Sequence, residues 1–220
     1  MSRSRDIADS TKTLDVDGGT IKLDGNYPVG TQNVALGDTA LDSVAADGNY
    51  NTAIGHASLT ANTTGDTNSA LGRESLLSNT TGSSNTAVGY TALLNNTTAS
   101  NNTAVGYQAG YSFTTGGYST VMGYQAAQNA TAGGTVAIGH SSAKNNTGAG
   151  ITAVGSNALV TNTSGTSSTG IGTNALNDNT TGSYNVALGR DALYNNTTAS
   201  NNTAVGYQSL LANTTGSALT

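Results

Sequence analysis

The chain has no cysteine and no tryptophan, a single proline, a single phenylalanine, and charged residues at only 9% of its 220 positions. Without cysteine, a disulfide framework and a cysteine-ligated metal site are both excluded. With so few large apolar side chains, the chain cannot build the thick core of an ordinary globular domain. No apolar run is long enough to cross a bilayer, so we expect no membrane insertion. The formal net charge of −5 argues against nucleic acid as a partner.

Glycine, by contrast, is abundant, with 29 residues, and eleven of them mark a repeat of 16 to 18 residues. The consensus of this repeat reads N-T-A-(V/I/L)-G-x-x-(A/S)-L-x-x-N-T-T-G-x-x. Residues 95–108 recur letter for letter at 195–208, which indicates that a block of repeats was duplicated. Such an array indicates a repetitive architecture rather than a unique active site. The repeat glycines are Gly37, Gly55, Gly72, Gly89, Gly106, Gly123, Gly139, Gly155, Gly172, Gly189 and Gly206.

A unit of about 17 residues is too short for the helix pair of most α-solenoids. Thr and Val or Ile just before the repeat glycine favour a short strand, and Asn-Thr-Thr-Gly favours a turn. We therefore expect an all-β chain, a parallel β-solenoid of about eleven coils over residues 31–220, preceded by a separate segment at 1–30. Identical side chains would stack in ladders from coil to coil, with the Asn side chains hydrogen-bonded along the stack.

One medium-sized apolar residue stands directly before each repeat glycine, and a small residue, usually Ala, stands before it. Adjacent strand residues point to opposite sides, so one row fills the coil and the other needs a partner. This need predicts a homotrimeric rod, with the three chains either intertwined or side by side. We assign the larger row to the structural core of the repeat: Leu36, Ile54, Leu71, Val88, Val105, Met122, Ile138, Val154, Ile171, Leu188 and Val205.

Several motifs that would indicate chemistry are better explained by the array. The dinucleotide-like fingerprint at 170–175 lies in register with the repeats and has no βαβ unit around it. His56 and His140 occupy the position after the repeat glycine, which also accepts Arg, Tyr, Asp, Ser and Thr and is therefore expected to face solvent. The many Asn-x-Thr sequons fall on the predicted turn ladder. We expect no catalytic residue, no cofactor and no metal.

Tyr90, Tyr107 and Tyr124 occupy that same position in three consecutive coils and should form a row with about 5 Å between neighbours. Aromatic rings with polar edges suit sugars and protein contacts, so this row is the candidate surface for binding. The alternative is that the rings stack on one another, and that Phe113 fills the space of the leucine that is missing at Gly110.

The repeats "NTAVGYQAG", "NTAIGHASL" and "TVAIGHSSA" resemble the head repeats of trimeric autotransporter adhesins, the YadA-like family. The resemblance implies a left-handed parallel β-roll with three chains to a rod. The longer form of the repeat looks more like those of fibres in marine tailed bacteriophages. The resemblance extends over residues 33–216 and depends on the whole array, since a single copy would carry little weight.

The N-terminal stretch favours the phage setting. It holds nine charged residues within its first 24 positions and no apolar segment of a secretory signal. Its opening residues, MSRSRDIAD, resemble the starts of structural proteins in tailed phages that infect marine bacteria. This resemblance implies a virion structural protein, assembled in the host cytoplasm, that attaches to another virion protein through residues 1–30. Its shaft would project for spacing or for contact with a host-surface glycan or protein. A bacterial trimeric surface adhesin is the alternative, and an ice-binding solenoid, suggested by the Thr ladders, is a third class.

Overall fold

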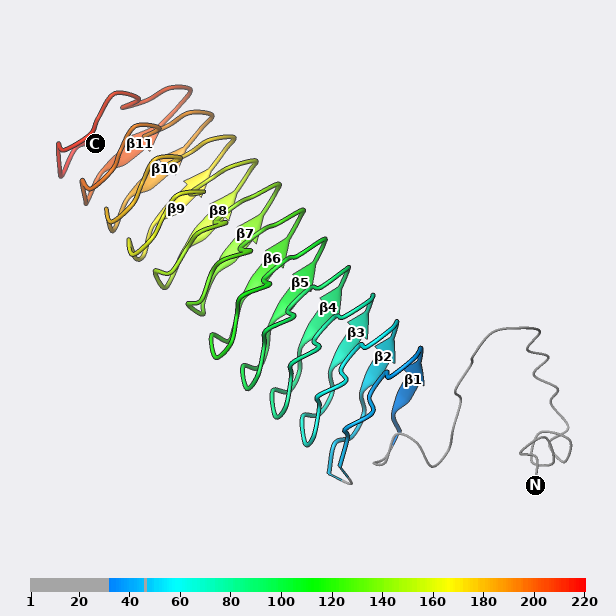
Figure 1. The fold of residues 1–220 in the computed structure, drawn as a ribbon. Coiled ribbons are helices and arrows are strands. Elements are labelled where there is room, and N and C mark those ends of the chain that lie inside the picture. Colours follow the sequence, from blue (N-terminus) through cyan, green and yellow to red (C-terminus); the bar gives the residue numbers. More distant parts are fainter. Residues whose placement is uncertain (1–31, 46) are drawn as a thin grey trace, which may run out of the picture.

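The computed structural model describes residues 32–45 and 47–220, and these form a parallel β-solenoid (Figure 1). The described residues contain no helix and eleven strands of three residues each. The segment at 1–30, which we expect to attach to the virion, lies outside the described residues. The strands are β1 (Val34–Leu36), β2 (Thr52–Ile54), β3 (Ser69–Leu71), β4 (Thr86–Val88), β5 (Thr103–Val105), β6 (Thr120–Met122), β7 (Val136–Ile138), β8 (Thr152–Val154), β9 (Thr169–Ile171), β10 (Val186–Leu188) and β11 (Thr203–Val205).

The strands form one parallel sheet in sequence order, with each strand paired only to those of the coils before and after it. The register is that of the repeat, so that Ala87 lies opposite Ala104 and Val88 opposite Val105. Outside the strands, backbone hydrogen bonds still join each coil to the next, as from Leu76 N to the Ala92 oxygen at 3.0 Å. The expected all-β parallel solenoid is confirmed, and Figure 1 shows its coils in a single continuous stack.

The small residue in the middle of each strand points into the coil, and both flanking residues point outward. Ala53, Ala87 and Ala104 are fully buried. The larger apolar row is outside: Leu71 is 49% exposed and Leu188 is 45% exposed. Our assignment of the larger row, Leu36 to Val205, to the core of the coil is therefore wrong for the single chain. The alternation of the two rows is confirmed, but the inward row is the alanine row.

The alanine row points inward because leucines on the side of the coil opposite the strands already fill the interior. The leucine four residues after the repeat glycine is fully buried in most coils, as at Leu59, Leu76 and Leu159. At Gly170, which replaces the usual alanine, an added Cβ would already lie 3.2 Å from Leu159 Cδ1. The lumen therefore has room for Ala but little more at this position, and the branched row is left on the outer face.

Two ladders of buried asparagine complete the interior. Asn79 is fully buried, and its Nδ2 donates to Asn62 Oδ1 at 2.8 Å and to the Gly82 oxygen at 2.9 Å. Its Oδ1 accepts a bond from Asn96 at 2.7 Å. In the second ladder, the backbone N–H groups of Asn68 and Asn85 donate to Oδ1 of the preceding asparagine, and their Nδ2 atoms donate to a turn oxygen. Most of these amides are satisfied by their neighbours, and Asn96 Oδ1, Asn102 Nδ2 and Asn202 Nδ2 are the buried exceptions. Satisfied amides of this kind stabilise a buried polar stack. The expected asparagine ladder is confirmed.

The middle of the array departs from this pattern. Three consecutive coils carry Gly110, Ala127 and Ala143 in place of leucine, and Phe113 takes the place of an asparagine. Phe113 is fully buried, and a Cβ added to Gly110 would lie 3.0 Å from its ring. The prediction that Phe113 fills the missing leucine's space is confirmed. Asn96 Oδ1 has no partner here, because no amide stands at position 113 to donate to it.

This exchange predicts strong coupling between positions 110 and 113. Phe113→Asn alone should lose roughly 2–4 kcal/mol, because the new amide cannot replace the volume of the ring. Gly110→Leu alone should also destabilise, because its Cβ would press on Phe113. The double variant recreates the Leu93–Asn96 pair of the preceding coil, where Leu93 already adopts φ 52°. Urea unfolding of all four proteins should give a double variant close to the wild type, with a coupling energy of at least about 2 kcal/mol. Additive losses would contradict this account.

Candidate functional site: an exposed ladder along one edge

The residues directly after the repeat glycines form an exposed line that we call the edge row. Its members range from Asp38 through Tyr107 to Tyr207, and their exposure confirms that this position faces solvent. The rings of Tyr90 and Tyr107 stack with centroids 5.5 Å apart, and those of Tyr107 and Tyr124 at 5.1 Å. The predicted row with about 5 Å between neighbours is thereby confirmed.

The ladder is longer than the three tyrosines. His140 continues it, with its ring 5.3 Å from that of Tyr124 and inclined by only 5°. At the other end, the Arg73 guanidinium lies over the Tyr90 ring at 5.7 Å, a cation–π contact. Our sequence analysis placed Arg73 and His140 at the same repeat position as the tyrosines but did not predict that they extend the stack. The signal was available, because side chains at one register position must meet in adjacent coils.

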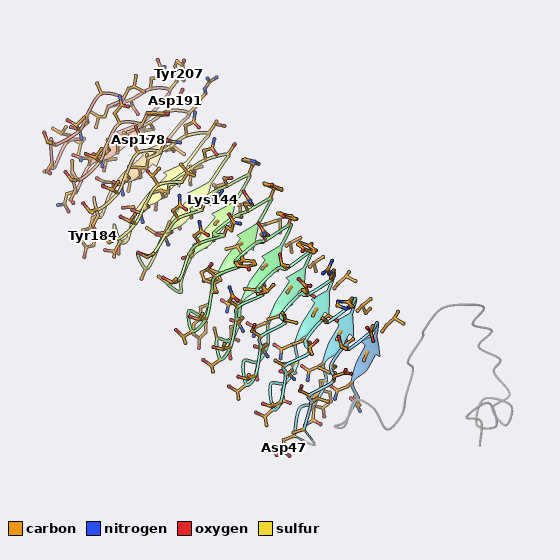
Figure 2. The ribbon with its side chains drawn as sticks, viewed as in Figure 1. Asp47, Lys144, Asp178, Tyr184, Asp191 and Tyr207 are labelled. Carbon is orange, nitrogen blue, oxygen red and sulfur yellow. The ribbon has the colours of Figure 1, made fainter. Side chains whose placement is uncertain are left out.

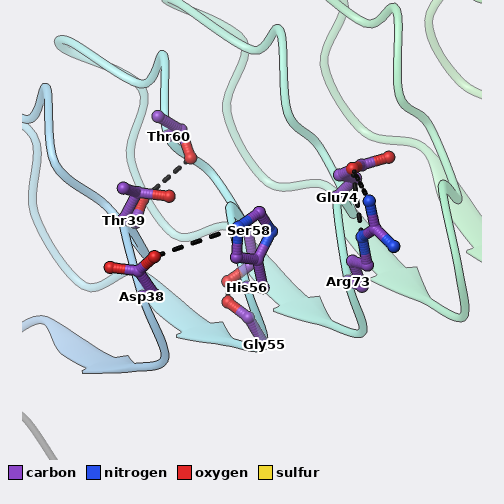
Figure 3. Close-up of polar contacts among 8 residues, drawn as sticks. All are labelled: Asp38, Thr39, Gly55, His56, Ser58, Thr60, Arg73 and Glu74. Carbon is purple, nitrogen blue, oxygen red and sulfur yellow. Dashed lines mark hydrogen bonds and ion pairs between the residues drawn. The ribbon is translucent and has the colours of Figure 1, made fainter. Parts of the chain in front are cut away.

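Ion pairs occupy the first coils of the edge row (Figure 3). Asp38 Oδ2 lies 4.0 Å from His56 Nε2, and both side chains are more than half exposed. Arg73 pairs with its own neighbour, Glu74, through Nη2 to Oε1 at 2.9 Å. Exposed pairs of this kind contribute little to stability.

Stacking limits what the tyrosines can bind. The two faces of Tyr107 are covered by Tyr90 and Tyr124, and those of Tyr124 by Tyr107 and His140. A sugar that packs on an aromatic ring needs a free face, so these rings offer only their edges and hydroxyl groups. The self-stacking alternative is therefore what the structure contains, and binding by Tyr90, Tyr107 and Tyr124 stays a prediction.

Interrupting the tyrosine stack should lower the free energy of unfolding only slightly. Tyr107→Ser removes two stacking contacts from a side chain that is 41% exposed. Each aromatic pair contributes about 0.5–1.5 kcal/mol when fully formed, so the total loss should stay at or below about 2 kcal/mol. Thermal unfolding followed by circular dichroism measures this, with Tyr184→Ser, an exposed and unstacked tyrosine, as the control. A loss of the folded stack on Tyr107→Ser would show that the edge row is part of the core.

The remaining candidate groups are not gathered into a site. Within residues 32–45 and 47–220, no three His, Cys, Asp or Glu side chains lie where they could hold a metal ion. The sequon asparagines Asn62, Asn79 and Asn179 are fully buried in the ladder, so the folded protein cannot present them for glycosylation. Figure 2 shows Asp47 and Tyr184 on the turn edge of the rod, away from Tyr207 on the edge row.

Comparison with protein-family models, with curated protein sequences and with solved structures gave no match. In the part of the chain that the structure describes, no helix has the length and apolar character needed to cross a membrane.

Proposed function

We propose that the chain is the shaft of a phage fibre, in which three copies pack side by side along their strand faces. The observation that carries this proposal is the outward apolar row next to the repeat glycines. Its exposed members in the single chain are Leu71 49%, Met122 45%, Ile138 36%, Ile171 38%, Leu188 45% and Val205 66%. Soluble monomers rarely expose a continuous apolar stripe of this length, and such stripes mark sites of association.

The composition of the strand face favours further copies of this chain as the partner. None of the eleven strands contains a charged residue, so charge cannot select a different protein along this face. A second copy offers the same row at the same spacing, and its branched side chains can interdigitate with those of the first along the whole rod. A threefold arrangement closes the assembly and covers every stripe. The proposal includes the left-handed coil that the resemblance to adhesin heads implies.

The place on a virion is supported by the resemblance of the repeats to those of phage fibres and by the resemblance of residues 1–9 to the starts of phage structural proteins. Residues 1–30 would attach the shaft to another virion protein. A bacterial surface adhesin would use the same trimer, so the genes next to the coding gene separate the two roles. Tail and neck genes would support the fibre, and a gene for an outer-membrane anchor would contradict it.

An ice-binding face is the second candidate, because a Thr row and the apolar row lie side by side on the outer face of the strands. Thr52, Thr86 and Thr103 are partly exposed there, two residues before the outward Ile or Val of the same strand. The two roles exclude each other, since a trimer buries the face that ice would need. A monomer that inhibits ice recrystallisation would establish the second role and overturn the first.

The trimer is tested by sedimentation equilibrium or light scattering on the purified chain. We expect a mass near three times the 21.8 kDa of one chain, unchanged over a tenfold dilution. A mass near a single chain would contradict the proposal. Labelling of purified phage particles with an antibody against the repeats then tests the virion role. A trimer in solution that is absent from the particle would contradict the fibre role and favour a bacterial surface adhesin.

A further inference from the structure

The edge row is interrupted after His140. The next two coils carry Ser156 and Thr173 in this position, and the row resumes with Arg190 in the coil after them. We call the space above Ser156 and Thr173 the edge notch. Because the coils stack in register through β7 to β10, the notch lies directly beyond the His140 ring along the rod.

One wall of the notch is a free aromatic face. Tyr124 covers one side of the His140 ring at 5.3 Å, and the other side faces the coil in which the small Ser156 stands. Elsewhere in the stack, the faces of Tyr90, Tyr107 and Tyr124 are covered by neighbouring rings or by Arg73. On the far side of the notch, the Arg190 guanidinium lies over the Tyr207 ring at 5.9 Å. The imidazole face of His140 is therefore the aromatic face next to the notch that can accept one more ring.

The space matches a ring in size. Tyr107 and Tyr124 fill their two positions with a centroid separation of 5.1 Å. The notch spans two such positions, and its walls are three coils apart, about 14 Å at about 4.8 Å per coil. One flat or puckered six-membered ring can therefore stack on His140, with a second sugar unit or solvent above Thr173.

The far wall and the floor of the notch carry hydrogen-bonding groups. Asn174 Nδ2 donates to Asp191 Oδ1 at 2.9 Å, and Arg190 Nε donates to Asp191 Oδ2 at 3.1 Å. These bonds hold Asp191 in place, with its side chain only 11% exposed. Asn157 adds a partly exposed amide beside Ser156. Because Arg190 and Asp191 neutralise each other, the notch suits an uncharged ligand with hydroxyl groups around its rim.

We propose that the edge notch is a binding site for a neutral hexopyranoside, with the apolar face of the sugar on His140. Its ring hydroxyls would bond to Ser156, Asn157, Thr173 and the free atoms of Asn174. A pyranose presents an apolar C–H face and a polar rim, which matches an aromatic wall beside a polar floor. This site is separate from the strand face, so it does not depend on the trimer or on the virion role.

The experiment is ligand-observed NMR on the full chain with the methyl glycosides of glucose, galactose and N-acetylglucosamine, followed by titration. We expect saturation transfer to at least one of them, strongest at the C–H face of the ring. Ser156→Tyr fills the notch with a side chain that other coils already place in the edge row. Asp38→Tyr puts the same side chain in the same row at the first coil and is the matched control.

We expect His140→Ser to weaken binding about two- to tenfold, the effect of losing one stacking contact, and Ser156→Tyr, which fills the notch, to weaken it at least as much. Asp38→Tyr should bind as the wild type does, and circular dichroism should show all four proteins folded alike. The proposal is overturned if no glycoside shows saturation transfer with the wild type, or if Ser156→Tyr retains full affinity. Binding of adenosine in the absence of glycoside binding would also overturn it, since the site would then be one for aromatic bases.

Discussion

Ala104→Asp is expected to unfold the stack of coils, whereas Val105→Asp, one residue further on, is expected to leave it folded. Ala104 is fully buried inside the coil, where a carboxylate would have neither water nor a partner. The loss should exceed about 4 kcal/mol, which is exceptional for a single substitution. Val105 lies on the outer face of β5, so an aspartate there stays hydrated in the single chain.

The two variants distinguish a position inside the coil, Ala104, from a position in the proposed interface between chains, Val105. For Val105→Asp we expect native circular dichroism and a mass near one chain, because the carboxylate would have to be buried in a trimer. Thermal unfolding and light scattering on the same samples decide the matter. Our sequence-based assignment of Val105 to the core of the coil predicts the opposite, with Val105→Asp unfolded. An unfolded Val105→Asp would contradict the strand orientation in which the alanine row points inward and the larger apolar row outward.

Gly89→Ala is expected to have the second large effect. Gly89 has φ +131°, and an added Cβ would lie 2.5 Å from the backbone oxygen of Gly106 in the next coil. Neither the strained backbone nor the contact can relax, because the next glycine is held by its own coil. Positive-φ strain and the backbone contact together should cost more than about 3 kcal/mol.

Gly134→Ala is the matched control for Gly89→Ala. Gly134 has φ +68°, and its added Cβ would have no neighbour closer than 3.8 Å. In other coils the corresponding position holds Ser84 and Asn101 at φ near +60°, so a side chain is accepted there. We expect a cost of about 1 kcal/mol or less for the control. If the two variants shift the urea midpoint equally, then the close contact between glycines of adjacent coils is not the reason that position 89 requires glycine.

Much of the fold could be predicted from the sequence because every element is repeated eleven times. A strand of three residues such as Thr86–Val88 gives little signal alone, but its recurrence before each repeat glycine fixes strand, turn and register together. The asparagine ladder was predictable for the same reason. Alternation along the strand placed Ala104 and Val105 on opposite sides. It could not tell which side was inside, because that depends on how much space the opposite wall leaves.

The backbone of that opposite wall could not be predicted. Leu41, Leu59 and Leu76 all adopt φ between 50° and 57°, a region that leucine normally avoids. Nothing in a leucine indicates this conformation, and local propensity argues against it. The complete burial of each leucine compensates for the strain, which is a tertiary effect. The register of the repeat places the side chains from Arg73 to His140 in one row, but only the structure shows that the rings lie parallel and stack.

The most direct measurement of the central claim, that three copies cover the outward apolar row, is the reactivity of a single cysteine placed in that row. The chain has no other cysteine, so Leu188→Cys introduces one thiol at a side chain that is 45% exposed in the single chain. Thr181→Cys, on the exposed turn before β10, is the control. In the native protein we predict that a maleimide reagent modifies the cysteine at 188 at least about a hundredfold more slowly than the one at 181, as expected for a thiol in a packed interface. After unfolding in urea, the two rates should be equal. Equal rates in the native protein would contradict the account, since the row would then be open to solvent.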